Sequence, residues 1–413
     1  MTTRHVTIDR LGHLGDGIVD DAARDPPLYV PYALPGEEVE ITQSDGKAEL
    51  QSIKTPSPDR IEPICPHFGT CGGCAVQHLA PKTYRRWKRM HIDRAFRDHG
   101  LGSVKLSSLA VVPLASRRRA VLAAFRNGKT VQLGFYGRAS HDIVDVDHCP
   151  LLTSALNKAL AHVRALLSDV LIANKGARLT LIETDTGLDL DLASPSHRTA
   201  FDQARLAKIA GAFAFARISI DGDPIIELQA PQIKVGQALV ALPPAAFLQA
   251  TRQSEAAIAK HVVDAVGDAR SIADLFCGVG TFALRMAEKA HLYAADGWRP
   301  AVAALDAAAR QTPALRPVQT DVRDLAQRPL QRDELKPFDA VVFDPPRAGA
   351  GAQAQHLASS QVPTIVAVSC NPTTLARDCR QLIDGGYDIV SLAAIDQFLY
   401  SHHIECVAVL KRS

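Results

Sequence analysis

Two side chains near the end of the sequence have the chemistry of a nucleophile and a base. Cys370 directly follows the apolar segment 364–369, a predicted strand, and Glu405 directly precedes the last predicted strand. A cysteine at the carboxyl end of a parallel strand faces the ligand cleft, and a helix that begins after it favours its thiolate. A structural cysteine and a surface glutamate are the alternative, but the position of both residues at strand ends favours a reactive pair.

This pair matches what methylation of a pyrimidine carbon requires. Uracil C5 is too weak a nucleophile to attack a sulfonium methyl group, so a thiolate must first add reversibly to C6. After methyl transfer a base must remove the C5 proton before the cysteine can leave, and Glu405 is the available acceptor. An ordinary thiol is only slightly ionised at neutral pH, so we expect the site to stabilise the Cys370 thiolate.

A glycine-rich turn is a candidate cofactor loop. Gly278 and Gly280 lie in the segment DLFCGVGT, between a predicted strand and a predicted helix, where glycines let a ligand approach the backbone. Asp296 ends the next strand, where a carboxylate can accept hydrogen bonds from both hydroxyls of a ribose. With Ala283 the loop also fits the relaxed dinucleotide pattern, so NAD is an alternative. Hydride transfer needs neither the later DPPR segment nor Cys370, which favours another cofactor.

Four cysteines in the first half of the chain form a candidate metal site. Cys65, Cys71 and Cys74 lie in a glycine-rich loop, and Cys149 follows far downstream. Four thiolates bind either zinc or an iron–sulfur cluster. Zinc sites usually contain two CxxC pairs and only one is present, so the spacing favours a cluster over zinc or unrelated thiols. We expect a structural role, because the segment is far in sequence from the reacting groups.

Positive charge is concentrated in one block of the sequence. Residues 56–140 contain fifteen Lys and Arg against four Asp and Glu, although the whole chain has a net charge of only +2. Such a block can face a polyanion. A solvated helix face is the alternative, and the second cluster at Arg117–Arg119, followed by Arg126 and Lys129, favours the polyanion.

Three predicted domains position these residues. Residues 1–55 alternate apolar and polar side chains in short runs, which predicts a small antiparallel β barrel. After a proline-rich linker, residues 56–240 contain the cysteine loop, a basic helix at about 81–99, a hairpin with an Asn127-Gly128 turn and a helix at about 152–171. Residues 241–413 alternate apolar strands with helices, which predicts an α/β fold with a doubly wound parallel sheet.

Composition indicates the class of protein. Hydrophobic residues make up 47% and charged residues 22%, which is ordinary for a globular protein. No apolar run approaches the roughly 18 residues of a membrane span, and the N-terminus is charged. We therefore expect a cytoplasmic protein without structural disulfides, and no obligate protein partner is evident. The cysteines outside the candidate sites are predicted to be packing residues: Cys277, Cys379 and Cys406.

Several motifs together resemble one family. The segments DLFCGVG, FDPPRAGA, VSCNPTTLARD and DQFLYSHHIE resemble the signature set of the RNA uracil-5-methyltransferases, and CPHFGTCGGC with Cys149 resembles the iron–sulfur branch of that family. The N-terminal GDGIVD and VPYALPGEEVEI are similar to the TRAM domain, an RNA-binding barrel of the OB type. The combination most resembles the enzymes that modify 23S ribosomal RNA, with transfer RNA as the alternative substrate.

The resemblance implies roles for individual residues. It implies Cys370 as nucleophile, Glu405 as general base and a four-iron four-sulfur cluster on the four cysteines. It also implies a class I methyltransferase sheet that binds S-adenosylmethionine through Gln249, Phe276, Asp296, Asp321 and Asp344, beside the loop residues Gly278, Gly280 and Thr281. The sequence departs from the family pattern at Thr281, where asparagine is usual, and at Leu399 and Ser401, where proline and threonine are usual.

Three rival functions remain open on sequence grounds. A methyltransferase for exocyclic amines also has a DPP segment but places an aromatic residue after it, where this chain has Arg347. An RNA cytosine-5-methyltransferase normally has a further cysteine in the same segment, and here there is none. A non-catalytic RNA-binding protein that kept the cofactor fold is the third alternative.

Overall fold

An eight-stranded sheet forms the centre of the C-terminal half. The computed structural model describes residues 2–20, 27–44, 47–193 and 203–413, and within them the sheet order is β19-β18-β17-β20-β21-β23-β22-β7. Strands β17 to β21 are parallel, and β23 runs antiparallel to β21 and β22. The strands are β17 (Ser271–Leu275), β18 (His291–Asp296), β19 (Val318–Val322), β20 (Ala340–Phe343), β21 (Thr364–Ser369), β22 (Tyr387–Asp396), β23 (Glu405–Arg412) and β7 (Ser108–Val111).

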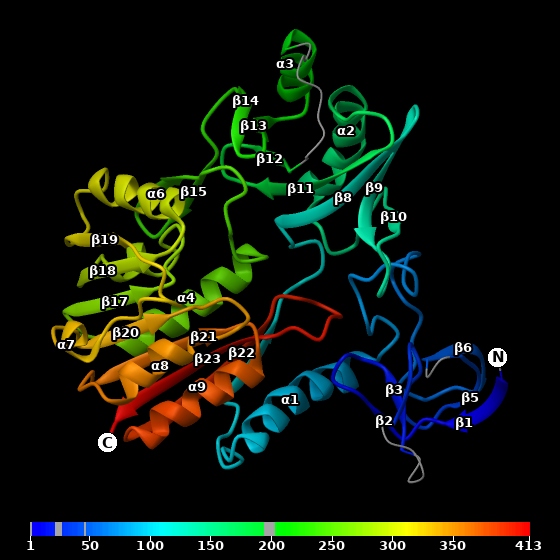
Figure 1. Ribbon diagram of the computed structural model, residues 1–413, viewed down its shortest axis with the longest axis horizontal. Helices are drawn as coiled ribbons and strands as arrows, with labels where there is room; N and C mark the ends of the chain where they lie inside the picture. Colours follow the sequence, from blue (N-terminus) through cyan, green and yellow to red (C-terminus); the bar gives the residue numbers. More distant parts are fainter. Residues whose placement is uncertain (1, 21–26, 45–46, 194–202) are drawn as a thin grey trace.

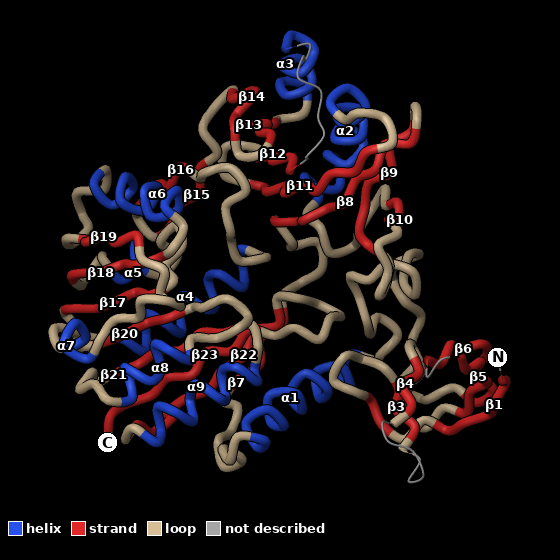
Figure 2. The backbone as a smooth tube through the Cα atoms, in the orientation of Figure 1, coloured by secondary structure: helices blue, strands red, loops and turns tan. Residues whose placement is uncertain are grey.

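Helices cover both faces of this sheet, as the apolar strands predict. Along β20, Val341 and Phe343 belong to one core cluster, whereas Ala340 and Val342 belong to the cluster on the opposite face. A strand that is buried on both faces is typical of doubly wound α/β folds. Figures 1 and 2 show the layers. The helices are α4 (Arg252–Val266), α5 (Ala283–Met286), α6 (Arg299–Arg310), α7 (Arg332–Leu335), α8 (Gly351–Ala358) and α9 (Pro372–Asp384).

The predicted basic helix packs against the C-terminal sheet. Helix α1 (Pro81–Asp98) lies beside α9 (Figure 1). Its Ile92, Ala95 and Phe96 are buried in the same core cluster as β20 and α9. Strand β7 pairs with β22 at the sheet edge. Two elements from residues 56–240 are thus part of the packing around the C-terminal sheet.

A second sheet lies above the first in Figure 1. Its order in the described chain is β10-β9-β8-β11-β12-β13-β14, and α2 and α3 pack on it. The hairpin turn is where the sequence predicted it, with Gly128 at φ 56° between β8 and β9. The elements are β8 (Arg119–Asn127), β9 (Thr130–Tyr136), β10 (Ile143–Asp145), α2 (Ser154–Val170), β11 (Lys175–Glu183), β12 (Leu188–Ala193), α3 (Gln203–Ala212), β13 (Phe215–Ile220) and β14 (Asp223–Glu227).

The N-terminal segment forms two small antiparallel sheets around one apolar core. The described strands pair as β1-β5-β6 and β2-β3-β4, and Ile8, Val30, Val39 and Ile41 fill the core between them. The strands are β1 (Thr2–Thr7), β2 (Arg10–Leu11), β3 (Gly17–Val19), β4 (Leu28–Val30), β5 (Glu38–Ser44) and β6 (Lys47–Thr55). The all-β character agrees with the predicted alternation, and a barrel of the OB type stays a prediction.

A short hairpin completes the described fold. Strands β15 (Gln232–Val235) and β16 (Ala238–Ala241) pair with each other, and β16 packs on α6. Among the described helices, none has the length and apolarity that a membrane crossing requires.

Candidate active site

Strand register places Cys370 opposite Glu405. In the antiparallel pairing of β21 with β23, Ser369 is the partner of Cys406. Continuing that register by one residue sets Cys370 against Glu405, and opposed residues of antiparallel strands have Cα atoms about 4.5–5.5 Å apart. Burial, and secondarily the Glu405 charge, raises the pKa of the Cys370 thiol, so the two side chains are near each other. The two reactive residues indicated by the sequence therefore meet at the carboxyl edge of the sheet.

Glu405 is a buried carboxyl group with one free oxygen. The residue is 3% exposed, and its Oε1 accepts a hydrogen bond from Gln397 Nε2 at 2.8 Å. Its Oε2 is buried without a hydrogen-bond partner in the described part of the chain. Burial, and secondarily the charge of Asp344, raises the pKa of Glu405. The raised pKa makes the Glu405 carboxylate a stronger base, and its free oxygen can accept a proton when the group is ionised.

A pair of glutamines connects Glu405 to the predicted cofactor residues. Gln397 Nε2 also donates to Gln249 Oε1 at 2.6 Å, and Gln249 Nε2 donates to Asp344 Oδ2 at 3.2 Å. The Gln397 amide is fixed from its other end, because its Oε1 accepts a hydrogen bond from Ala250 N. Glu405 and the predicted cofactor residues Gln249 and Asp344 thus belong to one hydrogen-bond network, and such networks hold their members in one geometry.

The environment of Cys370 differs from the expected one. We expected the site to stabilise the thiolate, but burial and the charges of Glu405 and Asp344 raise the pKa of Cys370 to about 11. Arg347 acts in the opposite direction and lowers this pKa. The prediction of a stabilised thiolate is wrong for these surroundings, because the sequence revealed neither the burial of the thiol nor the two carboxyl groups near it.

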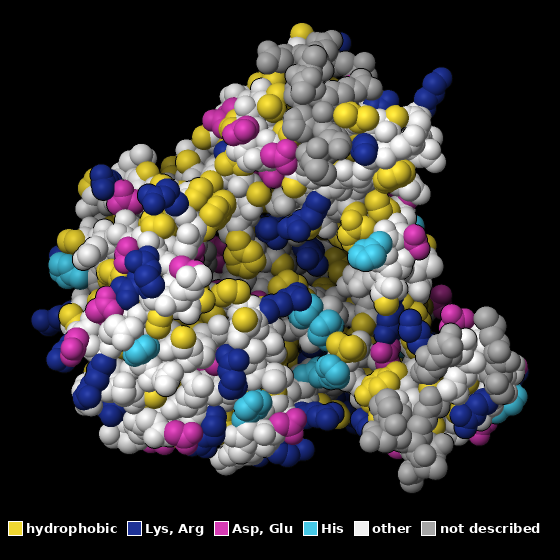
Figure 3. All heavy atoms as spheres, in the orientation of Figure 1, with side chains coloured by type: hydrophobic (Ala, Val, Ile, Leu, Met, Phe, Trp, Pro, Cys, Tyr) yellow, Lys and Arg dark blue, Asp and Glu magenta, His cyan; other side chains and the backbone are white. Residues whose placement is uncertain are grey.

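A groove of 580 Å³ opens over Cys370. In it, Arg347 Nη2 lies 3.0 Å from His403 Nε2. Burial and the neighbouring cations lower the pKa of His403 to about 3, so its neutral ring accepts the hydrogen bond from Arg347. Figure 3 shows one face of the molecule, hollowed near its centre, with Lys, Arg and His side chains around the hollow. Arginine and histidine side chains from four parts of the chain line the groove: His13, His91, Arg94, Arg347, His402 and His403.

The predicted cofactor loop has the backbone of a ligand-binding turn. Phe276, Gly278 and Gly280 all have positive φ, of 61°, 53° and 91°. A Cβ at Gly278 would meet no atom within 4 Å, whereas a Cβ at Gly280 would lie 2.8 Å from the Leu305 side chain. Gly278 therefore keeps the loop open, and Gly280 lets α6 pack closely. The loop is fastened by Gly278 N, which donates to Asp296 Oδ2 at 3.0 Å.

The other predicted cofactor residues gather at the same edge. Asp296 ends β18, Asp321 lies in the neighbouring β19, and Asp344 follows β20, which β17 separates from β18. Asp321 is held by Tyr293 OH at 2.7 Å. The carbonyl of Thr281 accepts a hydrogen bond from Arg285, which orients the loop and leaves the threonine hydroxyl outside that contact.

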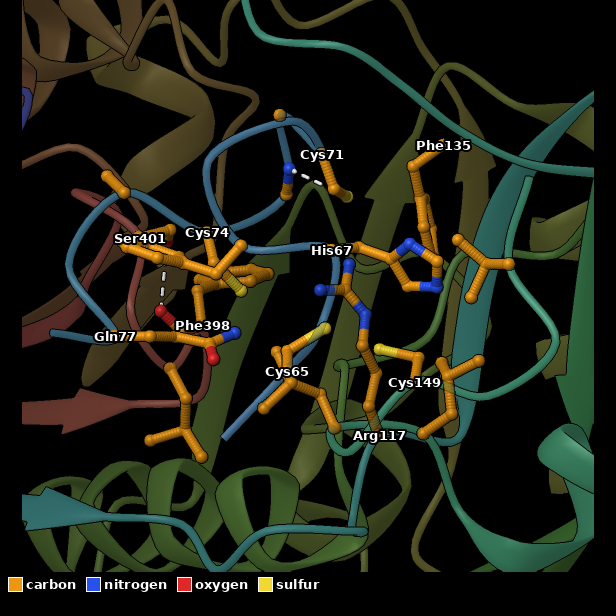
Figure 4. Close-up of a pocket in the computed structure, with 18 of the residues that line it drawn as sticks. Cys65, His67, Cys71, Cys74, Gln77, Arg117, Phe135, Cys149, Phe398 and Ser401 are labelled. Carbon is orange, nitrogen blue, oxygen red and sulfur yellow. Dashed lines mark hydrogen bonds between the residues drawn. The ribbon is translucent and has the colours of Figure 1, made fainter. Parts of the chain in front are cut away.

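The four candidate ligand cysteines line one cavity of 310 Å³ (Figure 4). The same cavity is lined by the segment between β22 and β23, including Phe398 and Leu399. It shares Arg347, His402 and His403 with the groove over Cys370. The sequence separation that placed this site far from the reacting groups was therefore misleading. Metal binding is not confirmed, because no three His, Cys, Asp or Glu of the described residues are arranged to hold an ion.

Part of the predicted basic surface is buried. Lys88 Nζ pairs with Asp396 at 2.8 Å, with both side chains fully buried. Arg118, 2% exposed, pairs with Glu255, so the prediction that it faces a polyanion is wrong. Arg117 instead points into the cysteine cavity (Figure 4). The outer face of α1 does expose the expected charges of Lys82, Arg85, Arg86, Arg89, Arg94 and Arg97.

Comparisons with known proteins decide the family. Residues 216–413 match the family model described as tRNA (Uracil-5-)-methyltransferase. An uncharacterized RNA methyltransferase of Rhizobium meliloti (strain 1021) is 44% identical, with 100% of both chains covered. The 23S rRNA (uracil(1939)-C(5))-methyltransferase RlmD of Chromohalobacter salexigens is 32% identical, with 100% of this chain and 90% of its own length covered. The chain belongs to the RNA uracil-5-methyltransferase family.

Membership of this family confirms the resemblance found in the sequence motifs. As an RNA uracil-5-methyltransferase family member, the protein is an RNA methyltransferase with an α/β methyltransferase sheet. A solved tRNA (uracil-54, C5)-methyltransferase of Pyrococcus abyssi, in complex with S-adenosyl-L-homocysteine, has the same fold. The TM-score is 0.76 at 21% identity, over 98% of this chain and 100% of that chain.

Several residues of the site in this family member were not predicted from the sequence. Gln397 donates a hydrogen bond to Glu405. Its presence in the same motif as Glu405, DQFLYSHHIE, was the sequence signal that could have indicated this role. The contact between Arg347 and His403 joins two motifs that were considered separately. Arg117 was counted only as surface charge. No sequence signal placed it among the cysteines, because a run of arginines does not show which member turns inward.

Proposed function

We propose that this protein transfers a methyl group from S-adenosylmethionine to C5 of a uridine in RNA. The observation that carries the proposal is the opposition of Cys370 to a buried Glu405 whose Oε2 has no other partner in the described chain. Cys370 Sγ adds to C6 of the uracil, and the electron pair that moves to C5 takes the methyl group. Glu405 Oε2 then accepts the C5 proton, and the pair left behind re-forms the C5–C6 double bond and expels the thiolate.

The proposed cofactor site is the carboxyl edge of β17 to β20. Open backbone at Gly278 and a row of carboxyl groups fit a ligand that has ribose hydroxyls and a positive charge. S-adenosylmethionine supplies a methyl group on a sulfonium. We assign its binding to Gln249, Phe276, Gly278, Gly280, Thr281, Asp296, Asp321 and Asp344.

A charge effect accounts for catalysis by a thiol with a raised pKa. A cation bound beside Asp344 and Cys370 favours the ionised form of both groups, which opposes the effect of burial. Arg347 already acts in this direction. We therefore propose that the reactive thiolate forms mainly in the loaded site.

The cysteine cavity fits a four-iron four-sulfur cluster. Burial raises the pKa of Cys71, Cys74 and Cys149, so ionisation of these thiols needs a cation such as iron. Arg117 has no acidic residue among the groups that raise its pKa, only Cys149 and Cys74, and a buried cation favours an anionic centre. The cavity volume of 310 Å³ is on the order of ten times the volume of one water molecule, so the cavity has room for a group larger than a single ion. Zinc is the second candidate.

We propose 23S ribosomal RNA as the substrate. RlmD, at 32% identity, aligns with the whole chain, and the exposed Lys and Arg side chains of α1 suit an RNA backbone. Transfer RNA is the alternative, favoured by the description of the family model. In the proposed division, residues 1–55 are a TRAM-like RNA-binding barrel, residues 56–240 hold the cluster and residues 241–413 carry the reaction. The proposed location is the cytoplasm.

The direct test is product mapping. Total RNA from cells that lack this gene is incubated with the purified protein and methyl-labelled S-adenosylmethionine, and labelled nucleosides are identified and located. We expect 5-methyluridine at one position of 23S rRNA. Label confined to transfer RNA would change the substrate, and RNA binding without any methyl transfer would favour the non-catalytic alternative.

A further inference from the structure

Tyr400 has a backbone conformation that its residue type disfavours. Its φ is +60°, a region that glycine adopts readily and a bulky residue rarely does. Tyr400 N donates to Tyr84 OH at 3.0 Å. Tyr400 O accepts two hydrogen bonds from the cysteine loop, from Ala75 N at 2.7 Å and Val76 N at 3.1 Å. Both backbone polar groups of one strained residue are therefore held by segments more than 300 positions earlier in the chain.

Helix α1 fastens the same segment at both ends. Tyr84 OH donates to Asp396, and Lys88 Nζ pairs with the other oxygen of that carboxylate at 2.8 Å. Lys88 Nζ also donates to the backbone carbonyls of Phe398 and His403. Because Lys88 and Asp396 are fully buried, removing either partner leaves the other without compensation.

The fastened segment lies between the two cavities. Residues 398–403 follow β22 and lead directly into Glu405 at the start of β23. Phe398 faces the cysteine cavity, and His403 borders both that cavity and the groove over Cys370. His403 in turn contacts Arg347, the cation that lowers the pKa of the nucleophile. The position of this segment therefore sets the surroundings of Cys370.

We propose that Tyr400 is a positioning residue. Its backbone is held by hydrogen bonds from the cysteine loop to Tyr400 O and from Tyr400 N to Tyr84 of α1. These contacts, which we call the clamp, fix residues 398–403 beside the nucleophile. The catalytic consequence rests on the proposed function, whereas the clamp itself does not. Tyr400 lines neither cavity, so its effect is carried by the segment and not by contact with substrate.

A matched pair of substitutions isolates the backbone effect. Tyr400→Gly and Tyr400→Val both remove the aromatic ring, whose centroid lies 5.6 Å from that of the Tyr84 ring. Glycine adopts φ +60° without strain, whereas a β-branched residue is strongly disfavoured there. We expect Tyr400→Gly to keep kcat within about threefold of the wild type. We expect Tyr400→Val, and Tyr84→Phe, which loses the acceptor for Tyr400 N, to lower kcat about tenfold or more with KM for S-adenosylmethionine unchanged.

Hydrogen exchange of the folded protein gives a readout independent of activity. The clamp predicts that amides of residues 398–404 exchange faster in Tyr400→Val than in Tyr400→Gly, while amides of the cofactor loop at 274–282 stay as protected as in the wild type. Equal protection of 398–404 in both variants would overturn the clamp. A wild-type protein without methyl transfer would overturn the proposed function instead, and the exchange comparison would still decide the clamp.

Discussion

At the residue scale, the proposed chemistry depends on one thiol and one carboxyl group whose surroundings oppose ionisation. The sequence indicated both as candidates, because each stands at a strand end in a recognisable motif. It could not predict their pKa values, since these depend on burial and on groups such as Asp344 and Arg347 that only the folded chain brings near them.

Replacement of the base should separate the two halves of the reaction. Glu405→Gln keeps the shape of the side chain but cannot accept the C5 proton, so we expect kcat to fall by about 10²- to 10⁴-fold. The methylated covalent intermediate should then accumulate, because the cysteine cannot leave. Denaturing gels of protein and labelled RNA measure this directly. Glu227→Gln, at an ion pair with Arg217 in the second sheet, is the control, and an equal loss there would contradict the assignment.

The reactivity of Cys370 should depend on pH in a defined direction. Since its pKa is raised to about 11, the thiolate fraction below that value grows tenfold with each pH unit. Alkylation of Cys370 by iodoacetamide, followed by peptide mass spectrometry, should therefore accelerate continuously from pH 7 to pH 10. Arg347→Met removes the cation that lowers this pKa and should slow alkylation at every pH in that range. A rate already constant above pH 8 would contradict the electrostatic account.

At the element scale, helix α1 does more than present basic residues. Its periodicity and length were readable, and the observed bounds differ from the predicted ones by one residue. Its packing against the C-terminal sheet could not be predicted, because the residue type alone does not show that a lysine such as Lys88 is buried. The partner, Asp396, is 308 positions away, and local patterns contain no information on such pairs.

Replacing one member of the buried Lys88–Asp396 ion pair should lower the free energy of unfolding more than replacing both members. Lys88→Met leaves the Asp396 carboxylate without its cation, so we expect the free energy of unfolding to fall by about 3–5 kcal/mol in urea titrations. The double substitution Lys88→Met with Asp396→Asn should recover part of that loss, because no uncompensated charge remains. Lys82→Met, on the exposed face of the same helix, should leave stability unchanged. Equal effects of Lys82→Met and Lys88→Met would contradict the role given to the pair.

At the scale of the whole molecule, three segments far apart in sequence meet around Cys370. The alternation of strands and helices predicted the C-terminal sheet, and the cysteine spacing predicted which thiols gather. Neither predicted that the cysteine cavity and the groove over Cys370 share the lining residues Arg347, His402 and His403. That arrangement results from tertiary packing of the N-terminal segment, α1 and the β22–β23 connection.

Metal analysis tests the cysteine cavity. We expect the purified protein to contain about four irons per chain and a visible absorption band that dithionite bleaches. Cys149→Ser should lose iron and band, and the unpaired Arg117 should then lower the melting temperature. Cys277→Ser, a buried cysteine outside the cavity, should retain the iron. A colourless protein with one zinc per chain would contradict the cluster.

The most direct test of the central claim is covalent trapping. RNA that contains 5-fluorouridine at the target position cannot lose its C5 substituent as a proton, so with S-adenosylmethionine present the enzyme should form a stable adduct through Cys370. We expect one adduct per chain on denaturing gels for the wild type and for Cys379→Ala, and none for Cys370→Ala. An adduct that survives Cys370→Ala, or no adduct with the wild type on an RNA that it methylates, would contradict the account.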